Sequence, residues 1–120
     1  MQRLFGPGYP WAIPWLERIL PSIEQITRLH TERTLFTRFI PAQRPGEGAG
    51  AWSRYYERWA DVTLEKVSPE AVRPHPVLER FVPPAMVLDK RVYFPWAEGA
   101  LDRWVSDKHV NTVIISGGEN

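Results

Sequence analysis

The chain has 120 residues, a net charge of +1, 43% hydrophobic residues and no cysteine. This length suits one domain, the near-neutral net charge does not favour binding to nucleic acid or to an anionic membrane, and the lack of cysteine excludes disulfides and thiol nucleophiles. No apolar run is long enough to cross a bilayer and the N-terminus lacks a signal-peptide pattern, so we expect a cytoplasmic location.

The first predicted element is a helix that begins at Pro14, where a missing N–H costs nothing. Pro21 falls inside the helical pattern, so we expect it to kink the helix or to split it into two turns that continue in register. One face of the helix is apolar. Its members are Leu16, Ile19, Leu20, Ile23 and Ile26.

The next segment, Thr34 to Ile40, is β-branched and aromatic with almost no polar alternation. That composition is typical of a strand buried on both faces of a parallel sheet. The glycine- and proline-rich stretch from Pro41 to Gly50 then predicts a flexible loop.

A second helix is predicted from aromatic residues at helical spacing. They are Trp52, Tyr55, Tyr56 and Trp59. Two interpretations of this stripe stay open: a face that packs on the core, or a wall that binds a substrate or a partner.

Five prolines interrupt the stretch from Val67 to Ala85, which predicts one helical turn near Val77 to Phe81. His75 lies between two prolines and is predicted to be a loop residue and not a ligand. The short apolar run from Met86 to Leu88 predicts a second buried strand.

The last predicted helix opens at Pro95, with Glu98 in its first turn and Lys108 and His109 in its last, as the helix dipole favours. Asn111 is expected to end it in the left-handed conformation. Its apolar positions are Ala97, Ala100, Leu101, Trp104 and Val105.

Thr112 to Ser116 predicts a third buried strand, so the elements alternate between helix and strand along the chain. That alternation predicts an α/β fold with a parallel sheet covered by helices on both faces. Sites in such sheets form at the carboxyl ends of the strands, which here are Pro41, Asp89–Lys90 and Gly117 to Glu119.

Lys90 at a strand end is a candidate acid–base group or electrostatic stabiliser, although a lysine there is more often simply solvated. The side chain of Asp89 is expected to point to the opposite face. Gly117 and Gly118 are candidates to present backbone N–H groups to an anion or an oxyanion. The three histidines, His30, His75 and His109, have no metal-ligand spacing. We expect neither a metal nor a cofactor.

Three segments, FTRFIPAQRPGEGAGAW, DKRVYFPW and NTVIISGGE, resemble the isochorismatase-like cysteine hydrolases. The resemblance covers essentially all of the chain. It implies a partial doubly wound, Rossmann-like parallel sheet of about three strands, in which residues 1–120 form an incomplete domain. The first and last strands of the family fold would be missing, and that first strand would lie between the second and the fourth.

Family members hydrolyse a small amide or a vinyl ether with an Asp, a Lys and a Cys. The resemblance implies that Lys90 is the triad lysine and that Gly117 and Gly118 belong to the turn before the nucleophile. The pocket wall would be formed by Tyr93, Trp96 and Trp52. Met1–Gln2 match the end of the family's Asp-x-Gln motif, so the Asp would precede Met1 and the Cys would follow Asn120. We therefore expect residues 1–120 alone to be inactive.

Two alternatives remain. The first is a non-catalytic interaction or self-association module, a homo-oligomer among its forms, that uses the Trp52/Tyr55/Tyr56/Trp59 face and an exposed sheet edge. The second is a metal-free lyase or hydrolase that uses Lys90 alone. The missing central strand also predicts a marginally stable chain, because unpaired backbone groups in an apolar setting are costly.

Overall fold

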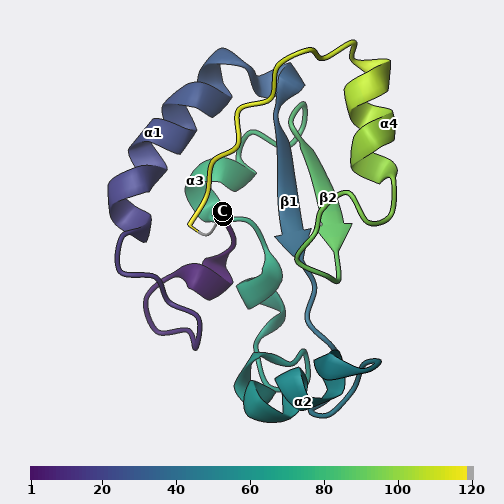
Figure 1. Cartoon of the computed structure of the whole chain (residues 1–120). Coiled ribbons are helices and arrows are strands. Elements are labelled where there is room, and N and C mark those ends of the chain that lie inside the picture. Colours follow the sequence, from purple (N-terminus) through teal and green to yellow (C-terminus); the bar gives the residue numbers. More distant parts are fainter. Residues whose placement is uncertain (119–120) are drawn as a thin grey trace.

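The computed structural model describes residues 1–118 and has a two-stranded parallel sheet flanked by helices, which is compatible with the predicted α/β class (Figure 1). Strand β1 (Leu35–Phe39) pairs with strand β2 (Met86–Lys90) in register, from Leu35 opposite Met86 to Phe39 opposite Lys90. The α-helices are α1 (Leu16–Leu29), α2 (Ala51–Arg58), α3 (Pro76–Glu79) and α4 (Ala100–Asp107). Short 3₁₀ turns occupy Arg3–Phe5, Thr31–Arg33, Ala60–Val62 and Pro69–Val72. Within the described part of the chain, none of the helices is long and apolar enough to cross a membrane.

Helix α1 runs unbroken through Pro21, so of the two expected outcomes, a kink or a split, the split is wrong, and the helix starts at Leu16 and not at Pro14. A proline inside a helix removes one backbone hydrogen bond. The apolar residues on both sides of Pro21 pack on the same core, which holds the two halves together. That core consists of Leu16, Leu20, Ile23, Phe36, Leu78 and Ala85.

A second apolar cluster lies at the carboxyl end of β1, around α2. Its buried members are Phe39, Tyr56 and Val62, and Trp11, Trp52, Tyr55 and Trp59 pack on them while half-buried. The aromatic stripe of α2 is therefore a packing face in this structure. β1 links both clusters, since Phe36 belongs to the first and Phe39 to the second.

Burial of β1 on both faces was predicted and is confirmed in part, because Phe36 and Phe39 are three residues apart, lie on opposite faces and are both buried, whereas the other residues of the strand are half-buried. A two-stranded sheet leaves the outer edge of β1 without a neighbouring strand, and side chains near that edge stay accessible. β2 extends two residues beyond the predicted run, to Lys90. The predicted helical turn in the proline-rich stretch is confirmed as α3, which starts one residue earlier, at Pro76.

Helix α4 begins five residues later than the sequence predicts, because Pro95 to Gly99 forms turns. Gly99 adopts a left-handed conformation with φ of 69°, which turns the chain before the helix. Glu98 therefore precedes the helix and does not complement its dipole. The left-handed residue after the helix is His109, with φ of 52°, and not Asn111.

The predicted third strand over Thr112 to Ser116 is wrong, since this segment is extended but pairs with no strand among residues 1–118. The sheet therefore has two strands and not about three. Val113, Ile114 and Ile115 are 52%, 69% and 71% exposed. Figure 1 shows the chain leaving α4, passing in front of the top of the sheet and descending towards the N-terminal segment. A strand forms only where a neighbour pairs with its backbone, and this path brings none.

Candidate functional site

Lys90 is the last residue of β2 and lies at the carboxyl edge of the sheet. Its Nζ donates a hydrogen bond to the carbonyl oxygen of Tyr93 at 2.8 Å. The side chain is half-buried, and burial lowers the pKa of Lys90, because removal from water disfavours the charged form. The loop after β2 therefore fixes the lysine at the strand end.

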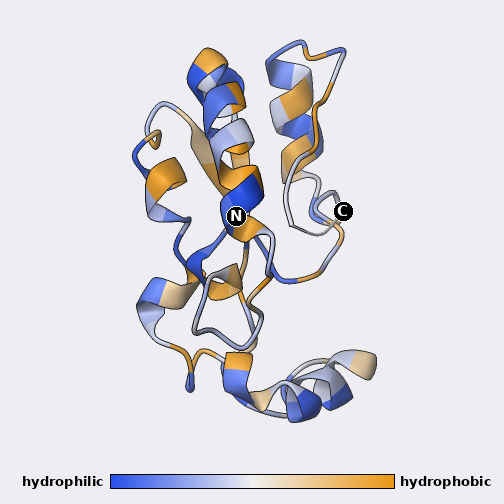
Figure 2. Ribbon diagram, turned by 90° about the vertical axis from the view of Figure 1, so that its left-hand side faces the viewer, coloured by the Kyte–Doolittle hydropathy of each residue, from blue (hydrophilic) through white to orange (hydrophobic). Residues whose placement is uncertain are grey.

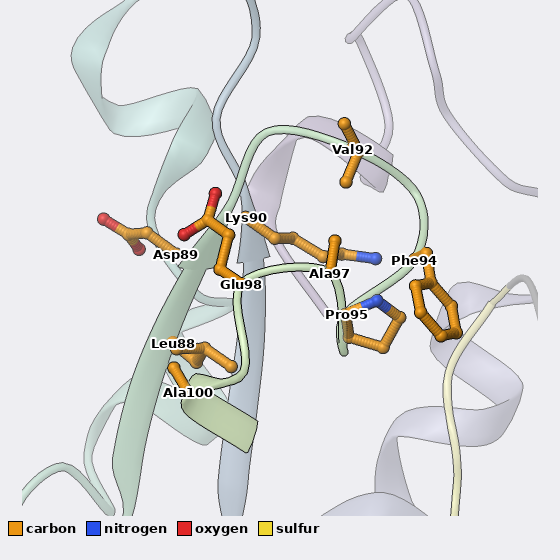
Figure 3. A pocket seen from close by; sticks show the side chains of 9 residues that line it. All are labelled: Leu88, Asp89, Lys90, Val92, Phe94, Pro95, Ala97, Glu98 and Ala100. Carbon is orange, nitrogen blue, oxygen red and sulfur yellow. The ribbon is translucent and has the colours of Figure 1, made fainter. Parts of the chain in front are cut away.

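Asp89 points away from Lys90, to the other side of β2, as the two-residue period of a strand predicts (Figure 3). Its carboxylate accepts two hydrogen bonds from Arg38, at 2.6 Å to Nε and 2.7 Å to Nη2. This bidentate pair is the main cause that raises the pKa of Arg38. Asp89 is thus engaged across the sheet and is no acid–base partner for Lys90.

The hollow beside Lys90 is small. Its volume of about 10 Å³ is roughly what one water molecule requires. Figure 3 shows the Lys90 side chain inside the curve of the following loop, with its nitrogen directed towards Phe94 and Pro95. The lining residues are Leu88, Asp89, Lys90, Val92, Phe94, Pro95, Ala97, Glu98 and Ala100. In this form the hollow has no room for an organic substrate.

The structure brings two of the three predicted wall residues together and leaves out the third. The ring of Tyr93 stacks on Phe39 at 5.9 Å and lies 5.4 Å from Trp52. The hydroxyl groups of Tyr55 and Tyr93 are 2.5 Å apart. Trp96 lies half-buried in the turn before α4, and no ring contact within residues 1–118 joins it to this cluster.

Gln2 has a role at this edge that sequence reasoning did not find. Its side-chain amide donates to the carbonyl of Phe39 at 2.8 Å and accepts from the N–H of Phe39 at 2.8 Å. It also donates to the carbonyl of Val72 at 2.9 Å, and the residue is only 3% exposed. The amide thus takes the place that a neighbouring strand would have beside Phe39. The resemblance implies that Met1–Gln2 lie beside the second strand of the family fold, but no local pattern in the sequence predicts these hydrogen bonds.

Contacts along the carboxyl edge connect Lys90 with both ends of the described chain. Lys90 is opposite Phe39 in the register, and Phe39 is bonded to Gln2. Gly118 lies next to Met1 and Ile13. A Cβ atom added to Gly118 would be 3.3 Å from Met1 Cε and would collide with the side chain of Ile13. The order along this edge is therefore β2, β1, Met1–Gln2 and Gly118.

The other predicted strand-end positions take no part in a pocket around Lys90. Pro41 is fully buried, so it packs and does not bind. The carbonyl of Gly118 accepts a hydrogen bond from Trp15 Nε1 at 3.3 Å, and the absent side chain makes room for Ile13. Gly117 precedes it in the same bend. Glu119 lies outside the described residues.

His75 is the N-cap of α3, and its Nδ1 accepts a hydrogen bond from the N–H of Val77 at 3.3 Å. Its backbone N–H donates to the carbonyl of Met1 at 2.9 Å. Burial, followed by the charges of Arg3 and the N-terminus, lowers the pKa of His75. Residues 1–118 contain no cluster of three His, Asp or Glu side chains that could hold a metal ion. The absence of a metal and of a cofactor stays a prediction.

No family model, no curated protein and no solved structure matches this chain. The resemblance to isochorismatase-like hydrolases therefore depends on the three sequence segments alone. The order of the segments along the carboxyl edge is an observation that does not depend on this resemblance.

Proposed function

We propose that this chain contributes the lysine side of an isochorismatase-like hydrolase site, within a Rossmann-like sheet, that acts on a small amide or a vinyl ether. The observation that carries the proposal is the order along the carboxyl edge. Met1–Gln2 lie between Phe39 of β1 and Gly118. This is the order that the resemblance implies, with the first strand between the second and the fourth.

Lys90 would supply positive charge at this site. An ammonium group in a partly buried position stabilises a thiolate or a developing oxyanion more strongly than one in water. The hydrogen bond from Nζ to the Tyr93 carbonyl holds that charge at the strand end. Tyr93, which is exposed and stacks on the buried Phe39, would offer an apolar wall for a small planar substrate, with the half-buried Trp52 beside it.

The 120 residues contain no cysteine, so the covalent step would need a thiol from outside them. The hollow beside Lys90 also has room for only about one water molecule, which is too little for an amide substrate. We therefore predict no amide or vinyl-ether hydrolysis by residues 1–120 alone.

The test is to express this chain together with the coding sequence that flanks it in frame and to assay amide hydrolysis. We expect an Asp from the upstream segment and a Cys from the downstream segment to give turnover. Lys90→Ala should lower kcat/KM by about 10²-fold or more, because an electrostatic stabiliser at the reacting centre is lost. The control is Lys66→Ala, which removes an exposed lysine outside the site and should leave turnover unchanged. Turnover that survives Lys90→Ala, or flanks without Asp and Cys, would refute the proposal.

The two alternatives have less support. Tyr56 is buried, and Trp52, Tyr55 and Trp59 pack around Phe39 and Trp11, so the aromatic stripe is occupied within the chain. A hydrolase or lyase that uses Lys90 alone would lack an acidic partner at Asp89, which is bound to Arg38. The exposed sheet edge that the first alternative also uses corresponds to the outer edge of β1, and this part of the alternative favours self-association.

A further inference from the structure

The outer edge of β1 has backbone groups that point away from β2. The N–H of Met86 donates to the carbonyl of Thr34, and the N–H of Ile40 donates to the carbonyl of Lys90. The backbone groups of the even-numbered residues from Thr34 to Ile40 therefore point to β2. Alternate residues of a strand direct their N–H and C=O groups to opposite edges, so Leu35, Thr37 and Phe39 face outwards. Gln2 satisfies Phe39 alone. In the described part of the chain, the outward groups of Leu35 and Thr37 have no hydrogen-bond partner.

The segment Thr112 to Ser116 has the composition of a strand but has no pairing partner in the described part of the chain. It has five residues, as β1 has, and it is extended, uncharged and β-branched at four of its positions. Its apolar side chains are exposed. Figure 2 shows apolar colour along the chain that leads from α4 towards the C-terminal label. Such a segment readily adds to an open sheet edge.

We propose that two copies of this chain associate by reciprocal strand addition, in which Thr112–Ser116 of each copy joins the outer edge of β1 in the other. Within one copy the segment is fixed away from that edge, since α4 precedes it and Trp15 binds the Gly118 carbonyl after it. Each copy has one donor strand and one open edge, so a pair satisfies both without another partner.

Apart from Gln2, which covers Phe39, the edge has none of the usual protections against pairing. In natural sheets, Lys or Pro residues on an edge strand often prevent pairing with another chain. Here the positions whose backbone groups point outwards without a partner are Leu35 and Thr37. The nearest charge on β1, Arg38, is neutralised by Asp89. The net charge of +1 opposes the approach of a second copy only weakly. This proposal does not depend on the hydrolase function.

Sedimentation velocity over a range of concentrations tests the proposal with the unmodified chain. We expect a dimer, and we expect Ile114→Lys to weaken it about tenfold or more, because a charge enters the added strand. Leu29→Lys is the matched control, because Leu29 on α1 is 70% exposed and Ile114 is 69% exposed. It should leave the dimer unchanged.

Thr37→Pro should weaken the dimer about as much, because it removes an outward N–H while the bonds to β2 remain. Since this variant risks misfolding, a cross-link provides a second measurement. The chain has no cysteine, so chains with Thr37→Cys and chains with Ile114→Cys can be mixed and treated with a short bis-maleimide. We expect mixed dimers in this mixture and not when Leu29→Cys replaces Ile114→Cys. A monomer at all concentrations, a dimer insensitive to Ile114→Lys, or equal cross-linking with Leu29→Cys would overturn the proposal.

Discussion

Helices α1 and α4 have similar amphipathic patterns, yet only α1 has a packed face. α1 buries Leu16, Leu20 and Ile23 against α3 and β1, whereas none of the residues of α4 is buried. The extended segment after α4 is exposed as well. The difference shows that an apolar stripe specifies a helix, while the depth of its burial depends on the surfaces that other elements offer.

The largest effect on stability is expected when one leucine in the first turn of each helix is replaced by alanine. Leu16 is 1% exposed, so Leu16→Ala should lower the free energy of unfolding by about 2–5 kcal/mol through lost burial and a cavity. Leu101→Ala removes a half-buried side chain and should cost about 1 kcal/mol or less. Urea denaturation measures both. Equal losses would mean that α4 is packed as tightly as α1.

The same contrast explains which parts of the fold could be predicted from the sequence. The residues of α1 and β1 carry local patterns, and these patterns predict the elements correctly. The segment Thr112 to Ser116 has an equally clear strand composition, but pairing depends on a neighbour that composition does not reveal. The start of α4 was misplaced because Pro95 suits a turn as well as a helix start, and Gly99 continues the turn.

At the candidate site, strand geometry is predictable from the sequence, whereas contacts between distant residues are not. The period of a strand correctly places Asp89 and Lys90 on opposite faces of β2. The contact between Gln2 and Phe39 joins residues 37 positions apart, and no local signal encodes it. Tyr93 and Trp96 lie in the same loop, yet only Tyr93 meets the aromatic cluster, because its ring stacks on Phe39.

The two proposals place different strands at the outer edge of β1. A first strand that ends at Met1–Gln2, as the hydrolase hypothesis requires, would pair with Leu35 and Thr37. The same groups accept the strand of a second copy in the proposed dimer. We therefore expect residues 1–120 alone to form a dimer, and we expect the chain expressed with its flanking coding sequence to be a monomer. The reason is that the two strands compete for one edge.

A smaller effect tests whether the N-terminal segment is held to the sheet by Gln2. Gln2→Ala leaves the N–H and carbonyl of Phe39 buried without a partner, so the free energy of unfolding should fall by about 1–3 kcal/mol. Asn111→Ala removes an exposed amide from the C-terminal segment and should change stability by less than about 0.5 kcal/mol. Thermal unfolding of both variants makes the comparison. A Gln2→Ala chain as stable as the original would show that these bonds contribute nothing net.

The smallest expected effect concerns pH and the contact of His75 with the N-terminal segment. Burial lowers the pKa of His75 in the folded chain below its ordinary value of 6.5, so the unfolded chain binds a proton more readily. Stability should therefore be full above about pH 6.5 and should decrease as the pH falls below it, because protons then favour the unfolded state. His75→Asn keeps an N-cap acceptor but does not titrate, so the part of the decrease that comes from His75 should disappear. His30→Asn, which replaces an exposed histidine at a turn, is the matched control. Unfolding free energies at pH 5 and pH 8 measure the three chains, and an unchanged decrease in His75→Asn would assign the pH dependence to other groups.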